Sequence, residues 1–200
     1  MRLLSRSNAL VWEALLMTIR NTPWDHPIPK RSQIHLDVVP SGVLHALAAG
    51  ESASLPLRYV SPFLAGPDAL GLWRMRSEQV NNTPTDAPWV TRLIIDPEIT
   101  PPVGVAGFHG APDYRGMIEV GYLVDPGFRR RGYARKSLEI LLDVASRQPD
   151  VRVVRATISP GNIASKTLID DFGFIEVGVQ WDDEDGLEII YEVDALGNRS

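Results

Sequence analysis

Five cationic side chains lie within eight residues of one another in the stretch DPGFRRRGYARKS, residues 125–137. They are Arg129, Arg130, Arg131, Arg135 and Lys136. An apolar pattern with helical spacing starts directly after Gly132, so the cations gather at the start of a predicted helix. The first backbone N–H groups of a helix have no partner inside it, and the helix dipole makes this end positive, which favours an anion. The cluster therefore predicts a site for a phosphate-bearing ligand; a solvated basic patch is the alternative.

Small residues inside the cluster narrow the kind of phosphate ligand. Glycine at position 132 lets a backbone approach a ligand closely, and Ala134 keeps the following side chain small. A P-loop that includes Gly127 and Gly132 would continue with Lys and then Ser or Thr, but Tyr133 and Ala134 follow instead. The sequence contains no G-x-G-x-x-G, so a dinucleotide-binding fold has no support.

Hydrophobic periodicity places the cluster between a strand and a helix. The predicted strands are 34–39, 89–96, 103–110, 117–125, 151–158, 174–181 and 187–193. The predicted helices are 41–50, 67–82, 132–147 and 162–172. Ser41 and Asn162 are the expected N-caps, and Gly50 and Gly173 the expected stops. The last two strands form a hairpin around the acidic turn DDEDG. This order predicts a mixed α/β fold with one central sheet.

The domain organisation follows from the start of the first long strand. Residues 34–200 are expected to form one domain, and residues 1–33 an N-terminal extension and linker. The linker is the Pro-rich stretch over 22–33. Before it, Glu13 interrupts an apolar run and no small-residue cleavage site follows, so a short amphipathic helix is expected rather than a signal peptide.

Composition excludes several classes of function. The formal net charge of −5 over 200 residues argues against bulk binding to nucleic acid or to an anionic membrane. There is no cysteine, which removes disulfides and thiolate metal ligands and fits the cytoplasm, the expected location. The four histidines lie without metal-ligand spacing, so no metal site is expected.

Three ordered blocks of sequence resemble the GNAT superfamily of acetyl-CoA-dependent N-acetyltransferases. RRRGYA (129–134) matches its Arg/Gln-x-x-Gly-x-Gly/Ala loop, after a strand and before a helix. NIASKTLIDDFGF (162–174) is similar to the family's Asn-x-x-Ser helix followed by Gly-Phe. WDDEDGLEIIYEV (181–193) is similar to the terminal hairpin of the ribosomal-protein N-acetyltransferase-like branch. The resemblance implies a mostly antiparallel, twisted central sheet, flanked by helices and splayed between its fourth and fifth strands.

The resemblance also implies which residues bind acetyl-CoA. Backbone N–H groups of the loop would hold the pyrophosphate, and Leu123 and Val124 would offer backbone hydrogen bonds to pantetheine in the splay. Asn162 matches the family residue that meets the pantetheine arm, and Ser165 matches the Ser of Asn-x-x-Ser. Their alternatives are plain N-capping and an exposed helix position. The implied loop residues are Arg129, Arg130, Arg131, Gly132, Tyr133, Ala134 and Arg135.

The implied chemistry is the attack of an amine on a thioester. Glu119, on the strand before the splay, matches a position where this branch often has Glu and is the candidate base; a solvent-facing or arginine-paired carboxylate is the alternative. Many family members donate a proton to the leaving thiolate from a Tyr in the later helix, but Ile169 occupies that position. Ser165, Tyr133, Tyr191 or water are the candidates to replace it.

We therefore expect a cytoplasmic N-acetyltransferase that moves the acetyl group of acetyl-CoA to a primary amine, either a protein N-terminus or a small molecule. The acidic hairpin turn is a feature that would attract a cationic acceptor. A non-catalytic acetyl-CoA-binding sensor is the alternative, because the expected Tyr is missing. The expected partners are the amine acceptor and, as one option for the oligomeric state, a second copy of the chain.

Overall fold

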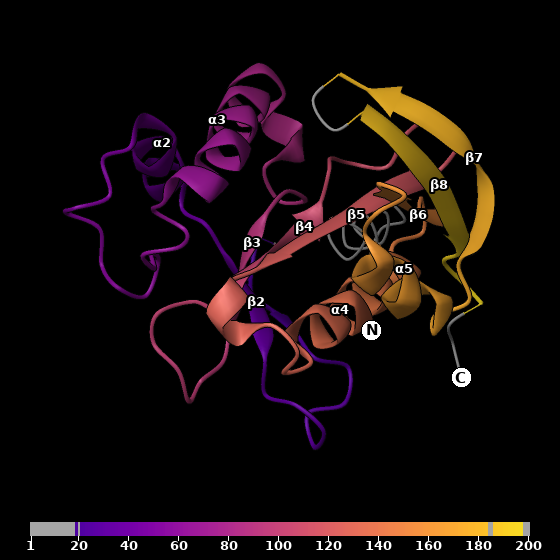
Figure 1. Ribbon diagram of the computed structural model, residues 1–200, viewed down its shortest axis with the longest axis horizontal. Helices are drawn as coiled ribbons and strands as arrows, with labels where there is room; N and C mark the ends of the chain where they lie inside the picture. Colours follow the sequence, from indigo (N-terminus) through magenta and orange to yellow (C-terminus); the bar gives the residue numbers. More distant parts are fainter. Residues whose placement is uncertain (1–18, 20, 184–185, 198–200) are drawn as a thin grey trace, which may run out of the picture.

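A computed structural model describes residue 19 and residues 21–183 and 186–197. One eight-stranded sheet forms the centre of the molecule (Figure 1), with the strand order β1-β2-β3-β4-β5-β6-β8-β7. The strands are β1 (Trp24–Asp25), β2 (His35–Val38), β3 (Arg92–Ile95), β4 (Gly104–Phe108), β5 (Met117–Val124), β6 (Val153–Ile158), β7 (Ile175–Asp182) and β8 (Gly186–Asp194). This arrangement confirms the mixed α/β fold with a central sheet.

All but one of the strand pairs in this sheet are antiparallel. The exception is the parallel pair β5–β6, whose register ends at Glu119↔Arg155 although both strands continue. β5 and β6 correspond to the fourth and fifth strands of the predicted sheet, so the predicted splay lies where the sequence analysis expected it. Figure 1 shows the two strands diverging, with β6, β8 and β7 turned away from the rest of the sheet.

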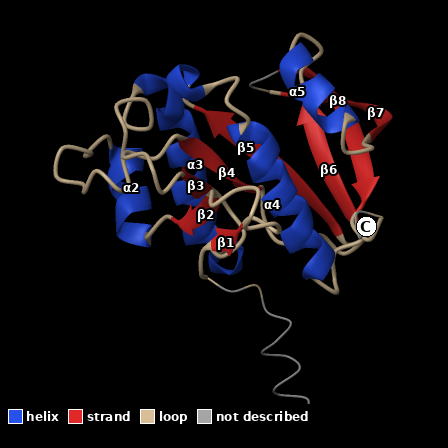
Figure 2. Cartoon of the chain, turned by 90° about the horizontal axis from the view of Figure 1, so that it is seen from below, coloured by secondary structure: helices blue, strands red, loops and turns tan. Residues whose placement is uncertain are grey.

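Helices cover the sheet on two faces (Figure 2). The helices α2 (Ser41–Ala49) and α3 (Pro67–Asn82) pack on Leu93 and Val105. On the other face α4 (Tyr133–Arg147) and α5 (Ile163–Asp170) pack on residues such as Ile94 and Val120. Two short 3₁₀ turns, η1 (Pro84–Asp86) and η2 (Pro126–Phe128), complete the connections.

The packing explains why these segments form these elements. Along β3, Leu93 and Ile94 are both fully buried but belong to different clusters, because successive strand residues point to opposite faces. In α4, seven buried residues recur at helical spacing, so one side of the helix lies on the sheet and the other is left to polar residues. The cluster under α4 and α5 extends across the gap between the diverging strands, since it includes Val120 of β5 and Ala156 of β6.

Most predicted boundaries lie within a few residues of the observed ones, and one predicted cap is wrong. Pro40, not Ser41, occupies the N-cap position of α2, and its carbonyl accepts hydrogen bonds from the N–H groups of Val43 and Leu44. Asn162 caps α5 as expected, and Gly50 and Gly173 have the left-handed backbone expected of helix stops.

The Pro-rich segment before β2 is tied to the sheet. Trp24 and Asp25 pair with β2, and the guanidinium of Arg92 lies 3.5 Å from the centre of the Trp24 ring. Buried His26 contacts Glu139 of α4 at 2.6 Å. The amphipathic helix expected further towards the N-terminus lies outside the described residues. In the part of the chain that the structure describes, no helix is long and apolar enough to span a membrane.

Candidate active site

The gap between β5 and β6 opens directly after Glu119. Val120 to Val124 continue β5 and pair only with β4, so one edge of this stretch faces the gap. Glu119 and Asp125 bond to the two residues that flank β4: His109 N–H donates to the carbonyl of Glu119, and Asp125 N–H donates to the carbonyl of Val103. Alternate residues of a strand direct their backbone groups to the same side.

This alternation decides which backbone groups face the gap. Leu123, paired with Val105, directs its groups to β4, whereas Tyr122 and Val124 direct theirs to the gap. The carbonyl of Val124 accepts a hydrogen bond from Arg129 Nε at 3.1 Å, which leaves its N–H for a ligand. Of the two backbone contacts expected from the sequence, the register favours Val124, and it brings in Tyr122 where Leu123 was expected.

Below the gap, the loop into α4 has the backbone that an anion site requires. Arg130 and Gly132 have positive φ values of 61° and 83°, and Gly132 is the N-cap. No side chain caps this end of α4, and its first turn holds no acidic residue. The first helical bond is from Lys136 N–H to Gly132. The N–H groups of residues 133–135 therefore have no partner inside the helix and are placed to bind an anion.

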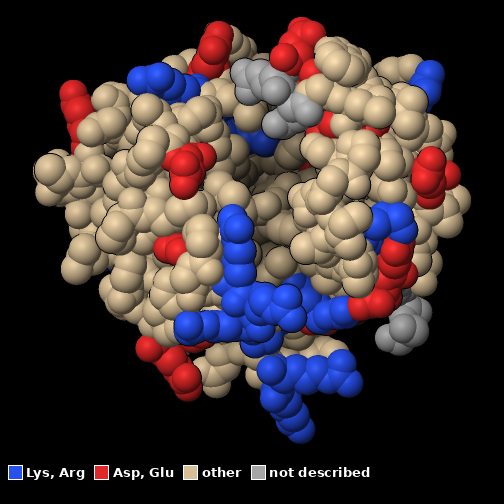
Figure 3. Space-filling view, viewed as in Figure 1, with Lys and Arg blue, Asp and Glu red and all other residues tan. Residues whose placement is uncertain are grey.

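Cationic side chains surround this helix end. In Figure 3, Lys and Arg side chains gather over η2 and the start of α4, at the lower rim of a central hollow. Arg135 forms an ion pair with Asp171, and Arg131 lies over the ring of Phe128. No described residue forms an ion pair with Arg130 or Arg131, so their charges are available to an anion.

Tyr133 anchors the helix start. Its side chain is buried, and its hydroxyl donates a hydrogen bond of 2.8 Å to Asp96. Burial and the neighbouring Asp96 carboxylate raise the pKa of Tyr133 to about 12. Tyr191 is also buried. Both tyrosines named as possible proton donors are therefore held inside the protein.

The start of α5 places Ser165 near the gap. Asn162 Oδ1 accepts a hydrogen bond of 3.1 Å from Ser165 N–H, which fixes the first turn. The Ser165 side chain interacts with the Tyr122 side chain of β5. Burial raises the pKa of Tyr122, and the interaction with Ser165 offsets only part of this effect. Ile169, at the position of the expected Tyr, is fully buried in the core.

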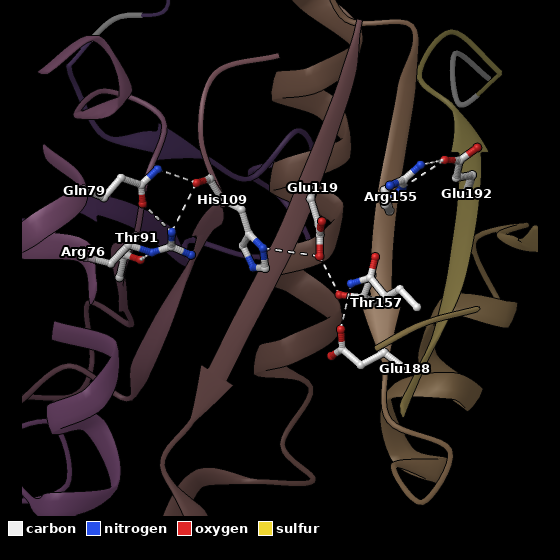
Figure 4. A network of polar contacts seen from close by, with 10 residues as sticks. Arg76, Gln79, Thr91, His109, Glu119, Arg155, Thr157, Glu188 and Glu192 are labelled. Atoms are coloured by element: carbon white, nitrogen blue, oxygen red, sulfur yellow. Dashed lines mark hydrogen bonds and ion pairs between the residues drawn. The ribbon is translucent and has the colours of Figure 1, made fainter. Parts of the chain in front are cut away.

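Glu119 is held in a polar network at the upper end of the gap (Figure 4). Thr157 of β6 donates a hydrogen bond of 2.5 Å to Glu119 Oε1, and His109 Nδ1 lies 3.3 Å from the same oxygen. Burial raises the pKa of Glu119, but the contacts with His109 and Thr157 and the charge of Arg155 outweigh it, so the net shift is downward. The carboxylate is thus ionised at neutral pH and is 19% exposed.

Glu119 opens into a cavity of about 790 Å³ on the α3 side of the sheet. The imidazole of His109, 44% exposed, lies over the backbone of Gly121, where an added Cβ would be 2.6 Å from Nε2. Other charged lining residues are Arg76, Asp182, Asp183 and Glu188. Trp181 also lines the cavity. The space is wide enough for a small acceptor, and four carboxylates give it a negative character.

Sequence reasoning named Glu119 but missed the residues that surround it. His109 comes just after β4 and reaches Glu119 because Phe108 pairs with Val120. Thr157 lies two residues beyond Arg155, the partner of Glu119 in the parallel pair. Arg76 arrives from α3. The order of the strands is the feature of the sequence that could have predicted these neighbours of Glu119, since adjacent strands bring the residues together once the register is known.

Comparisons with known proteins identify the family. A family model described as an acetyltransferase (GNAT) domain matches residues 57–175, more than half of the chain. The chain belongs to the GNAT acetyltransferase family. It is also 34% identical over 73 residues to an uncharacterized N-acetyltransferase, YjdG, of Bacillus subtilis (strain 168). That match covers 36% of this chain and 44% of the relative, so the chain spans under half the length of the relative.

Solved structures share the fold at low sequence identity. A chimera of the spermidine N-acetyltransferase SpeG from Vibrio cholerae and hSSAT has a TM-score of 0.61 at 15% identity, covering 84% of this chain and 100% of that one. RimL, a ribosomal L7/L12 alpha-N-protein acetyltransferase solved with coenzyme A, has a TM-score of 0.57 at 17% identity, covering 82% and 96%. These likenesses confirm the fold and include proteins with two different kinds of acceptor.

Proposed function

We propose that the chain is an acetyl-CoA-dependent N-acetyltransferase acting on a primary amine. The observation that carries this proposal is the alignment of three features along β5. An uncapped helix start lies below the strand, an open backbone edge runs along it, and the ionised Glu119 faces a cavity at its upper end. A pyrophosphate, a pantetheine arm and an acetyl group need these features in this order.

The residues present fit acetyl-CoA as co-substrate. The N–H groups of residues 133–135 and the side chains of Arg130 and Arg131 bind the pyrophosphate through charge-assisted hydrogen bonds. The backbone of Tyr122 and Val124 pairs with the amide groups of pantetheine as an added strand. Asn162, whose Oδ1 caps α5, presents its side-chain amide at the other side of the gap.

Glu119 and His109 act together in accepting the proton of the amine. An amine with a pKa near 10 is mostly protonated at neutral pH, so it must lose a proton before it attacks. The carboxylate of Glu119 orients the imidazole through Nδ1, which turns Nε2 towards the cavity. Imidazole is the side chain most often used for proton transfer near neutrality, whereas the pKa of Glu119 is lowered. The proton passes to this pair directly or through water.

The amine nitrogen then bonds to the thioester carbon and gives up its second proton, and the C–S bond breaks. Backbone N–H groups of Tyr122 and Val124 face the gap, where one of them stabilises the oxyanion. The electron pair of the broken bond remains on sulfur, and the resulting thiolate needs a proton. Ser165 supplies it in place of the missing Tyr, with the Tyr122 side chain beside it, and the proton released by the nitrogen restores the Ser165 hydroxyl through water.

A sensor of the same fold that binds acetyl-CoA without turnover is the second candidate. It is motivated by Ile169, which leaves the usual proton donor absent. The network around Glu119 favours the enzyme, because a sensor has no use for an ionised carboxylate and an imidazole in an open cavity.

The test is incubation of the chain with acetyl-CoA and a panel of amines, followed by measurement of free thiol and of the product masses. Enzyme-dependent release of CoA with an equal amount of acetylated amine is expected. Binding of acetyl-CoA without transfer to any amine would favour the sensor, and no binding would overturn both candidates.

A further inference from the structure

The cavity beside Glu119 contains one buried cation. Arg76 of α3 lines the cavity and is 5% exposed. Burial lowers its pKa, and the charges of Glu119 and Asp86 oppose this effect. Yet no carboxylate among the described residues lies within ion-pair distance of its guanidinium. A buried cation without a close counter-ion is costly unless something else completes its hydrogen bonds.

Two of the three nitrogens of Arg76 have partners in the protein. Nε donates to Thr91 Oγ1 at 3.2 Å. Nη1 donates to Gln79 Oε1 at 2.5 Å and to the carbonyl oxygen of His109 at 3.2 Å. Nη2 has no partner among the described residues. In Figure 4 the guanidinium points from α3 towards the side where His109 and Glu119 lie.

Arg76 is therefore held rigidly, with two donor N–H groups left over at the cavity. An arginine in this state recognises a carbonyl or carboxylate oxygen. Gln79 also donates to the carbonyl of His109, at 2.7 Å, and to Asp86, at 2.8 Å, so the orientation of Arg76 does not depend on a ligand.

The position of Arg76 relative to the base limits the acceptor further. Arg76 contacts the backbone carbonyl of His109, while Glu119 contacts the imidazole of the same residue. His109 alone thus lies between Arg76, which would bind an oxygen atom of the acceptor, and Glu119. An acceptor that reaches both must carry its amine and its oxygen only a few bonds apart, as an α-amino-acyl group does.

We propose that Arg76 Nη2 binds the carbonyl or carboxylate oxygen of an α-amino-acyl acceptor, such as a peptide N-terminus or an amino acid amide. This inference rests on the proposed function and names its acceptor class. A polyamine is disfavoured close to the reacting nitrogen, because its second ammonium group would have to avoid the guanidinium. The carboxylates Asp182 and Asp183 on the β7–β8 hairpin contribute to attracting the cationic amine into the cavity.

The experiment compares alaninamide, which has the carbonyl, with sec-butylamine, which lacks it, and with 1,4-diaminobutane. Steady-state constants are measured for the wild type, Arg76→Met and Gln79→Leu. In Arg76→Met, kcat/KM for alaninamide should fall about 10- to 100-fold, mainly through KM, while the value for sec-butylamine changes less than about threefold. Differences in amine basicity cancel, because each ratio compares a variant with the wild type.

Gln79→Leu keeps the charge of Arg76 but removes one hydrogen-bond partner of its Nη1, so it should lower kcat/KM for alaninamide in the same direction as Arg76→Met and by a smaller factor. The control for a purely structural role is the comparison of the two monoamines. If Arg76 only positions His109, then Arg76→Met will lower kcat/KM for both monoamines equally and the inference is wrong. Preference of the wild type for 1,4-diaminobutane, with improvement in Arg76→Met, would also overturn it.

A measurement on the wild type covers the case in which Arg76→Met does not fold. N-acetylalaninamide should inhibit competitively against the amine at least about tenfold more strongly than N-sec-butylacetamide. Equal inhibition would contradict the inference. If the wild type acetylates sec-butylamine but neither prefers alaninamide nor is inhibited more strongly by N-acetylalaninamide, the proposed function stands and the acceptor class is wrong. If it acetylates no amine, both proposals fail.

Discussion

The two halves of the candidate active site differ in how their residues are distributed along the chain. The cofactor half takes most of its groups from one continuous stretch, from the end of β5 through η2 into α4. The acceptor half combines Arg76, His109, Glu119 and Thr157, which come from four different elements or their ends. The cofactor half consists mainly of backbone groups whose positions are set by local conformation. The positions of the acceptor-half side chains depend on the register of the whole sheet.

The largest effect should come from the centre of the acceptor half. Glu119→Gln keeps the size of the side chain and one acceptor oxygen but removes the negative charge that orients and stabilises the imidazole of His109. We expect kcat to fall by about 10²- to 10⁴-fold, with little change in acetyl-CoA affinity. Steady-state kinetics and calorimetric titration measure the two quantities. Glu78→Gln, at an exposed position of α3, is the control, and a kcat within threefold of wild type for Glu119→Gln would remove Glu119 from the mechanism.

Substitutions in the cofactor half should show the opposite pattern: they should lower the affinity for acetyl-CoA more than they lower kcat. Gly132→Glu adds a Cβ at a position with a φ of 83°, which residues other than glycine rarely adopt, and places a negative charge beside the proposed pyrophosphate. We expect acetyl-CoA affinity to fall by at least about 100-fold, as measured by calorimetry. Gly71→Glu makes the same change at an open position of α3. Equal affinities in both variants would mean that the loop does not hold the pyrophosphate.

A smaller effect is expected where the two halves meet. Ser165→Ala and Tyr122→Phe each remove one hydroxyl of the proposed proton donor, and each should lower kcat by about fivefold. Because the two side chains interact, the double variant should lose less than the product of the single effects. Single-turnover kinetics measure this step, with exposed Thr167→Ala as the control. Additive losses would contradict a shared donor.

A last effect concerns stability alone. Tyr133→Phe removes the bond to Asp96 and should lower the free energy of unfolding by about 1.5–3 kcal/mol near neutral pH. The pKa of Tyr133 is raised to about 12 in the folded protein, so this stability is present below pH 10 and is lost as pH rises towards 12. Denaturant unfolding at pH 8 and pH 11 measures the difference, which should narrow at pH 11.

Tyr114→Phe serves as the control for that measurement, because Tyr114 is 89% exposed. It should change stability by less than about 0.5 kcal/mol at both pH values. A Tyr133→Phe difference that stays constant up to pH 11 would mean that the hydroxyl of Tyr133 is not held in its neutral form.

The contrast between the halves also explains what the sequence could predict. The helix over 67–82 and the loop into α4 follow from periodicity, caps and glycines, which act over a few residues. The splay was expected from a family resemblance and not from the residues themselves. The sequence analysis considered His109 only as a metal ligand, a role for which its spacing is unsuited, and only the pairing of β4 with β5 brings it to Glu119. The N-cap prediction for Ser41 was wrong because Pro40 can provide the first carbonyl equally well.

The missing Tyr also shows the limit of prediction from sequence. The motif predicted that the mechanism lacks its usual proton donor, because Ile169 occupies the position where the family often has Tyr. In the folded chain a different tyrosine, Tyr122, lies on β5 with its side chain in contact with Ser165. The proton donor that we propose in place of the missing Tyr cannot be predicted from a single motif, since it depends on the packing of α5 against the diverging strands.

The most direct test of the account is thermal unfolding of the wild-type chain with acetyl-CoA, CoA and ATP in parallel. The proposed site binds a pantetheine arm in the β5–β6 gap as well as a pyrophosphate, so acetyl-CoA and CoA should each stabilise the chain. A ligand at about 100 times its Kd should add roughly 2.7 kcal/mol, while ATP should add little. No stabilisation by either CoA species, or equal stabilisation by ATP, would contradict the claim that this gap is an acetyl-CoA site.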